Sequence, residues 1–286
     1  MSHHDTIFLE EARILEHEHW PGEQFVLRLE APKCARDACP GQFVHLTVDP
    51  LLPLRRPISI QRTDPEEGWV ELLYKRVGRG TALLAEKRAG ARLSLLGPIG
   101  RPFRVTRRRP LLLGGGVGMP PMVFLAESLK GCDMEPLAIL ASEVPFPFEP
   151  VESALPVEGL EPDIQAAHPL LETWGIPSRL ASTRIMPGVF RGYVTEAAQR
   201  WLTSLDETAR SEVELFACGP HPMLEAVVDL ARKFGLPVQI SLEEFMACGV
   251  GGCAGCVVEV ETERGPAMQR VCVDGPVFDG HRVFPA

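Results

Sequence analysis

Four cysteines near the C-terminal end of the chain have a spacing that suits metal chemistry. Counted along the sequence, the gaps between them hold four, two and fifteen residues. This C-x4-C-x2-C…C spacing is the one found at plant-type 2Fe–2S sites, where thiolates ligate both irons. Glycines within the loop let it fold tightly and expose backbone N–H groups to a sulfide core. We therefore predict a 2Fe–2S cluster with the ligands Cys248, Cys253, Cys256 and Cys272.

Two other interpretations of these cysteines stay open. A four-cysteine zinc site prefers two separate C-x2-4-C pairs, and only one such pair can be formed here, because fifteen residues separate Cys272 from Cys256. A redox-active disulfide is the third possibility. The remaining cysteines are scattered and suit small, partly buried apolar positions; they are Cys34, Cys39, Cys132 and Cys218.

A second set of residues could bind a flavin dinucleotide. The segment Arg56-Pro57-Ile58-Ser59 follows one expected strand, and Leu73-Tyr74-Lys75 and then Gly80-Thr81 follow another. The Arg56 guanidinium can bind a pyrophosphate with a fork of donors, Ser59 adds a hydroxyl, and Tyr74 adds an aromatic wall. Unpaired N–H groups at the start of a short helix also favour anions. Taken alone, Arg-Pro-x-Ser is more often an edge strand with a surface arginine. The flavin prediction therefore depends on where the motif lies in the order of elements along the chain.

A glycine-rich turn could bind a second dinucleotide. Gly114, Gly115, Gly116 and Gly118 lie between an apolar run and an expected helix. Because Met119 stands at the third glycine position, the turn is not the G-x-G-x-x-G fingerprint. A glycine turn before a helix is still a good phosphate cradle, and Cys218-Gly219-Pro220 ends a later strand. We expect a nicotinamide dinucleotide here, and a tight turn without a ligand is the alternative.

The elements that must position these residues change in kind along the chain. Up to residue 104, alternating apolar positions separated by turn residues predict a small antiparallel barrel. Thr81 to Lys87 has room for a short helix within it. The expected strands cover residues 25–29, 42–46, 69–74 and 92–96.

Buried strands then alternate with helices from residue 105 to 241, which predicts a parallel α/β sheet. Residues 144–178 contain seven prolines and little periodicity, and we expect an irregular surface insertion there. Residues 242–286 complete the chain as a cluster module, so the predicted fold class is β + α/β. The expected strands are 110–113, 137–140 and 214–217, and the expected helices 119–130 and 223–234.

Composition limits the class of function. With 29 Lys and Arg against 38 Asp and Glu, the net charge is −9, which argues against a general nucleic-acid binder. Hydrophobic residues make up 45% of the chain, which excludes a wholly disordered protein. The longest mostly apolar run without charges, residues 111–126, is too short and too broken for a membrane span. No signal peptide is visible, so we expect a cytoplasmic protein.

In this order, the motifs resemble the electron-transfer subunit of the two-component, NAD-linked dihydroorotate dehydrogenase, a flavoprotein of the ferredoxin-reductase type. That resemblance implies FAD at Arg56 to Ser59, Leu73 to Lys75 and Gly80-Thr81, with the cluster on the four cysteines. It also implies a hetero-oligomer with an FMN-bearing catalytic subunit in pyrimidine biosynthesis. The resemblance rests on Arg56–Ser59, Gly97–Gly100, Gly114–Pro121, Cys218–Pro220, Met246–Gly251 and Val271–Phe278.

The implied work is an electron relay. NAD(P)H and FAD exchange a hydride, the flavin splits the electron pair, and the cluster passes single electrons to or from the partner. We expect no catalytic side chain, since the cofactors do the chemistry. Two further classes stay open: a reductase of the same fold with another acceptor, and a cluster-bearing scaffold without nicotinamide turnover.

One segment departs from the family's pattern. Where family members have acidic residues, this chain reads Ser182-Thr-Arg184-Ile-Met-Pro-Gly188. A carboxylate can accept ribose hydroxyls, whereas an arginine suits a 2′-phosphate. We therefore expect NADH to reduce this flavin poorly compared with a typical member. NADPH, or a route through the partner, would replace it.

Overall fold

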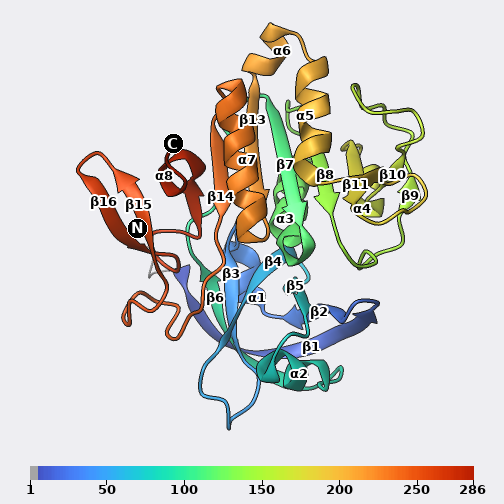
Figure 1. Ribbon diagram of the computed structural model, residues 1–286. Coiled ribbons are helices and arrows are strands. Elements are labelled where there is room, and N and C mark those ends of the chain that lie inside the picture. Colours follow the sequence, from blue (N-terminus) through green and yellow to red (C-terminus); the bar gives the residue numbers. More distant parts are fainter. Residues whose placement is uncertain (1–5) are drawn as a thin grey trace. The chain divides into compact units, whose positions relative to one another are not determined.

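The computed structural model describes residues 6–286, which divide into two compact units (Figure 1). The first contains the chain up to Pro102 together with Ser241–Val277, and the second contains Phe103–Ile240 with Phe278–Ala286. The segment that carries the four clustered cysteines is therefore part of the same unit as the N-terminal strands. No helix among the described residues is long and apolar enough to cross a membrane.

The first unit is built on a closed antiparallel barrel with the strand order β1-β2-β5-β4-β3-β6. Apolar side chains that alternate along the strands fill it, as shown by the fully buried Leu27, Leu29 and Leu72. This confirms the expected barrel. Its strands are β1 (Phe8–Trp20), β2 (Gln24–Glu30), β3 (Phe43–Thr47), β4 (Arg56–Asp64), β5 (Trp69–Lys75) and β6 (Arg92–Ile99).

The barrel differs from the expectation at two strands. β1 is rich in charged residues and buries only Ala12 and Ile14 fully, so its apolar alternation is weak. β4 begins at Arg56, so the Arg-Pro-Ile-Ser segment follows β3 as expected and also forms the start of a strand that was not expected. Pro57 hid this strand, because proline has no N–H for a sheet and usually argues against one.

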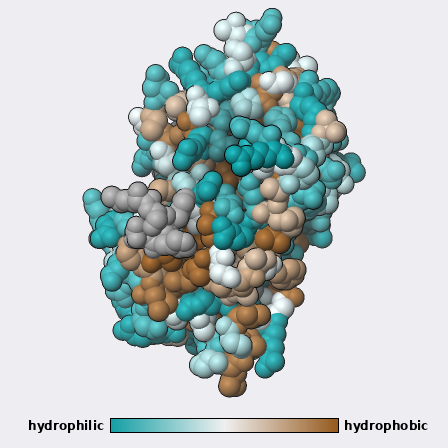
Figure 2. Space-filling view, turned by 90° about the vertical axis from the view of Figure 1, so that its left-hand side faces the viewer, coloured by the Kyte–Doolittle hydropathy of each residue, from teal (hydrophilic) through white to brown (hydrophobic). Residues whose placement is uncertain are grey.

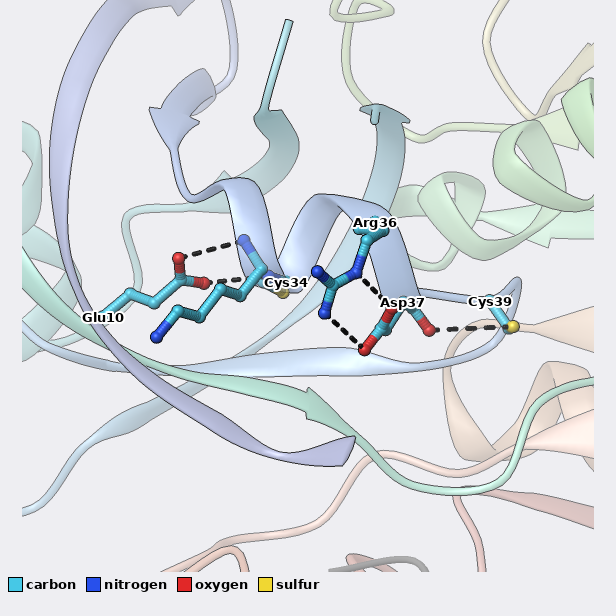
Figure 3. A network of polar contacts seen from close by, with 6 residues as sticks. Glu10, Cys34, Arg36, Asp37 and Cys39 are labelled. Carbon is cyan, nitrogen blue, oxygen red and sulfur yellow. Dashed lines mark hydrogen bonds and ion pairs between the residues drawn. The ribbon is translucent and has the colours of Figure 1, made fainter. Parts of the chain in front are cut away.

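Two short helices accompany the barrel. α1 (Pro32–Asp37) has no strong helix signal and was not expected, whereas α2 (Arg79–Ala85) begins two residues before Thr81. The Glu10 carboxylate from β1 accepts the N–H of Lys33 at 3.1 Å and of Cys34 at 2.8 Å (Figure 3). These first-turn donors have no partner within the helix, so Glu10 ties α1 to β1. Burial, and then the charge of Glu10, raise the pKa of the Cys34 thiol, which stays protonated.

The C-terminal segment of this unit consists of a loop over residues 242–256, called the cysteine loop, and a hairpin. β15 (Val257–Thr262) and β16 (Gly265–Arg270) pair as antiparallel strands. The Arg101 N–H donates to the Gly275 carbonyl at 2.6 Å, and the Leu242 N–H donates to the Pro276 carbonyl at 2.9 Å. These bonds fasten both ends of the segment close to the chain that leaves β6.

The second unit contains a sheet with the order β12-β11-β8-β7-β13-β14-β17. β11, β8, β7 and β13 are parallel. The chain runs outward from β7 on one side, then returns to place β13 on the other, so the order reverses between β7 and β13. The strands are β7 (Arg109–Gly115), β8 (Leu137–Ala141), β11 (Ser178–Ser182), β12 (Phe190–Arg191), β13 (Val213–Cys218), β14 (Val238–Ser241) and β17 (Val277–Asp279).

Helices connect and cover these strands. α3 follows β7 and buries most of its residues. α7 is amphipathic and buries one face, which includes Leu224, Val228 and Ala231. The alternation of buried strands and helices confirms the expected parallel α/β sheet. The helices are α3 (Met119–Ser128), α4 (Pro169–Thr173), α5 (Val194–Ser204), α6 (Glu207–Ser211), α7 (His221–Phe234) and α8 (Gly280–Val283).

Residues 144–178 contain little regular structure. Besides α4 they hold one short antiparallel pair, β9 (Val151–Glu152) with β10 (Ala166–Ala167). β11, which follows, was not expected because Ser-Arg-Leu-Ala-Ser is not an apolar run. It is buried nonetheless, since the Arg179 guanidinium donates to the carbonyls of Ser178 and Leu155, both at 2.7 Å.

Candidate functional site

The four clustered cysteines lie in two sulfur pairs. The side chain of Cys253 lies within hydrogen-bonding reach of Cys248, and that of Cys256 within reach of Cys272. Cys248 and Cys253 are the more exposed pair, and Cys256 and Cys272 are buried. The first three residues come from the loop before β15 and the fourth comes from the turn after β16, so the β15–β16 hairpin closes the group.

Backbone donors surround the first pair. Burial would raise the pKa of Cys248, but the N–H groups of Val250 and Gly252 and the Cys253 residue outweigh it and lower that pKa to about 7. Burial and then Cys256 raise the pKa of Cys272 to about 12. The backbone N–H groups that lower the pKa of Cys248 point to its sulfur. Donors of this kind also stabilise a negatively charged iron–sulfur core.

This arrangement fits a cluster better than a single ion. Four thiolates in two pairs give each of two irons a pair of ligands, whereas a structural zinc takes all four around one centre. The donor set therefore fits a 2Fe–2S group, with Cys248 and Cys253 on one side and Cys256 and Cys272 on the other.

Two glycines in the loop have no room for a side chain. Gly249 and Gly251 have left-handed φ angles of 70° and 81°, which strain any other residue. A β-carbon on Gly249 would lie 2.6 Å from Nδ1 of His45, and one on Gly251 would lie 2.6 Å from Val273 Cγ2. The loop thus packs on the chain beneath it through bare backbone.

An ion pair supports the same loop from the other side. The Arg270 guanidinium donates to the Gly251 carbonyl at 3.2 Å and to the Asp274 carboxylate at 3.2 Å. Burial raises the pKa of Asp274, but the hydrogen bonds and charge of Arg270 outweigh it and lower that pKa. Sequence reasoning missed three residues of this site. His45 lies about two hundred positions before the cysteines along the chain, and Arg270 and Asp274 look like ordinary surface charges.

The structure brings the two halves of the expected flavin site together. Arg56 in β4 places its guanidinium against Gly80, where a β-carbon would stand 2.0 Å from Nε. Its Nη1 donates to the carbonyls of Leu54 at 2.7 Å and Arg55 at 3.2 Å, which leaves other donors of the fork free of these bonds. The Arg-Pro-Ile-Ser strand and the start of α2 are thus neighbours, as a shared dinucleotide requires.

Thr81 shapes the turn that leads into α2. Its hydroxyl accepts the N–H of Val77 at 3.0 Å and of Gly78 at 3.1 Å, and it lies 3.1 Å from the Gly78 carbonyl as a donor. The hydroxyl is therefore engaged by the chain itself. What the turn offers an anion is the backbone N–H groups of the first helical turn.

Tyr74 is held by neighbours on two sides. Its ring stacks on Phe25 with centroids 5.2 Å apart, and its hydroxyl lies 2.9 Å from Nε2 of His17. Nδ1 of His17 lies 2.8 Å from the Lys87 carbonyl, so Nδ1 carries the proton, and Nε2 accepts from the tyrosine. Burial lowers the pKa of His17, which keeps this ring neutral, and burial raises the pKa of Tyr74.

The glycine turn and the Cys218 turn meet at the reversal point of the parallel sheet. A β-carbon on Gly118 would lie 2.3 Å from the Cys218 carbonyl oxygen, and one on Gly115 would lie 2.4 Å from Met223 Sδ. Close packing alone accounts for these glycines. Gly116 differs, because its φ is 56° and no atom lies within 4 Å of a β-carbon there. The crevice at the carboxyl ends of β7 and β13 is where open α/β sheets bind dinucleotides.

Arg184 lies on the same edge of this sheet. It is exposed and follows the end of β11, and its N–H donates to the Ser182 hydroxyl at 3.2 Å. Because β7, β8 and β11 are parallel, their carboxyl ends face the same way. Arg184 is therefore on the side of the sheet where a dinucleotide at the glycine turn would lie.

Known proteins share these features. A family model for the iron-sulfur cluster binding domain of dihydroorotate dehydrogenase B matches residues 243–284. The electron transfer subunit of dihydroorotate dehydrogenase B (NAD(+)) from Geobacillus thermodenitrificans (strain NG80-2) is 36% identical over 249 residues, which cover 84% of each chain. The subunit of the same name from Caldanaerobacter subterraneus subsp. tengcongensis is 30% identical and covers 96% of this chain and 97% of that one.

Solved structures agree in fold. The NADH-dependent reduced ferredoxin-NADP oxidoreductase, studied for flavin-based electron bifurcation, has a TM-score of 0.76 at 25% identity, covering 96% of this chain and 90% of that one. The ferredoxin reductase in carbazole 1,9a-dioxygenase has a TM-score of 0.61 at 23% identity, covering 82% of this chain and 69% of that one. Because relatives at or above 30% identity span most of its length, the chain belongs to the family of dihydroorotate dehydrogenase B electron transfer subunits.

Proposed function

We propose that this chain relays electrons between NAD(H) and the FMN-bearing catalytic subunit of dihydroorotate dehydrogenase, through FAD and a 2Fe–2S cluster, in pyrimidine biosynthesis. The observation that carries the proposal is the pairing of Cys248 with Cys253 and of Cys256 with Cys272 in one unit with the barrel. Relatives named as electron transfer subunits of dihydroorotate dehydrogenase B support the partner and the direction toward NAD⁺.

When bound, the nicotinamide and flavin exchange electrons in pairs and the cluster carries them singly. The chain's own residues bind and orient these groups. Arg56 supplies a fork of donors for a diphosphate, and the backbone at the start of α2 adds N–H groups to the same region. The turn at Gly116 leaves open backbone for the nicotinamide dinucleotide. The four cysteines supply the cluster with thiolates, and Arg270 holds their loop closed.

The partner needs a surface near the cluster from which electrons can pass. In the first unit several large apolar side chains are exposed, and Phe245 in the cysteine loop is the most open at 93%. Figure 2 shows apolar side chains gathered in the lower half of that view. An exposed aromatic side chain beside the cysteines is a candidate contact for the partner. The exposed large apolar residues of this unit are Leu9, Leu51, Leu54, Val77, Phe245, Val250 and Met268.

Eight free cysteines favour work in a reducing compartment. We therefore extend the proposal to the cytoplasm, where the dihydroorotate system is expected to operate. Export of the mature protein to an oxidising compartment in its host would contradict this part of the proposal. Fractionation of host cells, followed by blotting for the chain, measures it directly.

A reductase that serves another acceptor is the second candidate. The ferredoxin-NADP oxidoreductase structure, with a TM-score of 0.76 and 25% identity, favours it. Both candidates need FAD, cluster and nicotinamide, so only the acceptor separates them. The chain should be purified without oxygen and analysed for iron, sulfide and FAD. It is then mixed with the catalytic subunit and dihydroorotate.

Bleaching of flavin and cluster by dihydroorotate, only when the catalytic subunit is present, is the expected result. A chain that is reduced by a nicotinamide but never by dihydroorotate with that subunit belongs to the second candidate. Stoichiometric zinc without acid-labile sulfide contradicts both.

A further inference from the structure

His45 connects the flavin-binding strands to the cysteine loop. It lies in β3, where its direct partner across the sheet is Pro57 of β4, and Phe43 is likewise opposite Ser59. Directly opposed residues share a face of an antiparallel sheet. The imidazole of His45 therefore lies on the face that carries Pro57 and Ser59, two of the residues expected to contact FAD. Val44 and Ile58 occupy the other face.

His45 is buried, and the cysteine loop packs against its ring. The residue is 0% exposed, and its Nδ1 faces Gly249, where a β-carbon would stand 2.6 Å away. The carbonyl groups of Cys248 and Arg55 lie near enough to influence the ring. Gly249 follows Cys248, the first expected ligand, directly.

By strict geometry neither nitrogen of this ring has a hydrogen-bond partner among the described residues, but backbone carbonyls of Arg55 and Cys248 lie close enough to accept weak hydrogen bonds from it. Buried polar groups are nearly always paired, and an exception needs an explanation. An apolar side chain of similar size would fill the same space without leaving two polar atoms unpaired. The chain places a histidine there all the same, against the backbone of a proposed ligand, so its polar atoms have a use that packing does not supply.

We propose that His45 is a positioning residue for the 2Fe–2S cluster, holding the Cys248–Gly249 backbone against the β3–β4 face through its ring N–H. The inference rests on the proposed function and adds a residue outside the cysteine segment to the cluster site. Hydrogen-bonding partners around a metal's ligands orient them and tune the metal. The ring acts through the loop backbone, so it shapes the surroundings of Cys248 without serving as a ligand.

Replacement of the ring tests this directly. His45→Leu removes both nitrogens, and His45→Gln retains a donor and an acceptor. Each variant and the parent are purified without oxygen, and their electron paramagnetic resonance, midpoint potential and iron release to a chelator are compared. We expect His45→Leu to alter the spectrum and potential and to release iron about tenfold faster, as losses around metal ligands do. His45→Gln should restore much of the parent behaviour.

A matched control comes from the second unit. His168 is also buried, at 5% exposure, but its Nδ1 accepts the N–H of Leu170 at the start of α4. His168→Leu should therefore lower the thermal midpoint and leave the cluster spectrum as in the parent. His45→Leu should alter the cluster spectrum, because it removes the ring nitrogens that face the Cys248–Gly249 backbone. A lowered thermal midpoint with an unchanged spectrum, potential and release rate in His45→Leu overturns the inference.

The glycines of the loop give a second test that needs no leucine variant. Gly249→Ala and Gly251→Ala strain the backbone similarly, but only the first new methyl group meets His45. Changing His45 to alanine as well should relieve part of the iron loss caused by Gly249→Ala and none of that caused by Gly251→Ala. Equal responses of the two glycine variants contradict the contact. If the parent itself binds no iron and sulfide, the proposed function fails. If the parent holds a cluster that the His45 variants leave unchanged, only the inference about His45 fails.

Discussion

The guanidinium of Arg56 occupies the space in which a side chain at Gly80 would stand, since a β-carbon there would lie 2.0 Å from Nε. The strand that carries Arg56 and the helix that begins beside Gly80 are thus fitted to each other before any ligand binds. A preplaced guanidinium loses little freedom when it binds a diphosphate. The fit explains why glycine stands at position 80, although its backbone is helical.

Gly80→Ala should weaken FAD retention, because the new methyl group displaces the Arg56 guanidinium. Loss of one charge-assisted contact of about 1.5–3 kcal/mol corresponds to one to two decades in affinity. Arg56→Ala should lose a similar amount, and the double variant little more than either. Flavin released during dialysis, measured by fluorescence, gives the result. Gly78→Ala is the control, because no atom lies within 4 Å of its β-carbon, and it should retain FAD as the parent does.

His17 should make stability depend on pH. Burial lowers its pKa in the folded protein below the ordinary value of 6.5. Between the lowered pKa of the folded protein and the ordinary pKa of the unfolded chain, the unfolded chain binds more protons. The stability that the neutral ring contributes is therefore present above pH 6.5 and is lost as the pH falls below it. The advantage of the parent over His17→Gln should therefore shrink between about pH 8 and pH 5. Urea midpoints of both proteins across this range measure it, and a constant difference would show that His17 does not titrate as its burial requires.

The cluster should depend on the paired cysteines and on none of the exposed ones elsewhere. Cys253→Ser and Cys272→Ser each remove a thiolate from one pair and should abolish most of the visible absorbance of the cluster. Cys39 and Cys132 are exposed, and their thiols donate hydrogen bonds to the backbone carbonyls of Asp37 and Ser128, at 3.9 and 3.8 Å. Cys39→Ser and Cys132→Ser should retain full iron and sulfide. Loss of the cluster in either control would contradict the assignment of ligands.

Arg184 should shift the choice of nicotinamide. Its guanidinium suits a 2′-phosphate, and a carboxylate at the same position suits the free ribose hydroxyl. Arg184→Glu should therefore raise the rate of flavin bleaching by NADH relative to NADPH. Anaerobic stopped-flow with both nucleotides at equal concentration measures the ratio. Fast bleaching of the parent by NADH, with strong preference over NADPH, would show that Arg184 does not set the choice and that the name of the relatives, which specifies NAD(+), applies unchanged.

Phe245 should anchor the catalytic subunit. Aromatic side chains at interface centres often contribute more than 1 kcal/mol each, so Phe245→Ser should weaken the complex by about tenfold. Calorimetric titration of the holo chain with the catalytic subunit gives the affinity. Ile185→Ser is the matched control, because this side chain is 80% exposed in the other unit. Equal affinities of the two variants and the parent would remove Phe245 from the interface.

The sequence alone determined the features that follow from short-range order along the chain. A spacing of four and two residues between cysteines fixes which sulfurs can meet in one loop, so the cluster could be predicted without coordinates. Alternation in Phe25 to Leu29 and in Trp69 to Tyr74 reports a buried and an exposed side of a strand. The glycine turn between strand and helix, Gly114 to Gly118, is equally local.

The tertiary structure decided whatever depends on residues far apart in the chain. β4 is a strand because β3 and β5 pair with it on both sides, although Pro57 argues against one locally. β11 is buried because a folded neighbour accepts the hydrogen bonds of Arg179. His45 carries no signal at all in its own segment. Its contact with Gly249 exists only because the cysteine loop folds back over β3, and long-range packing of this kind leaves no periodic trace in the sequence.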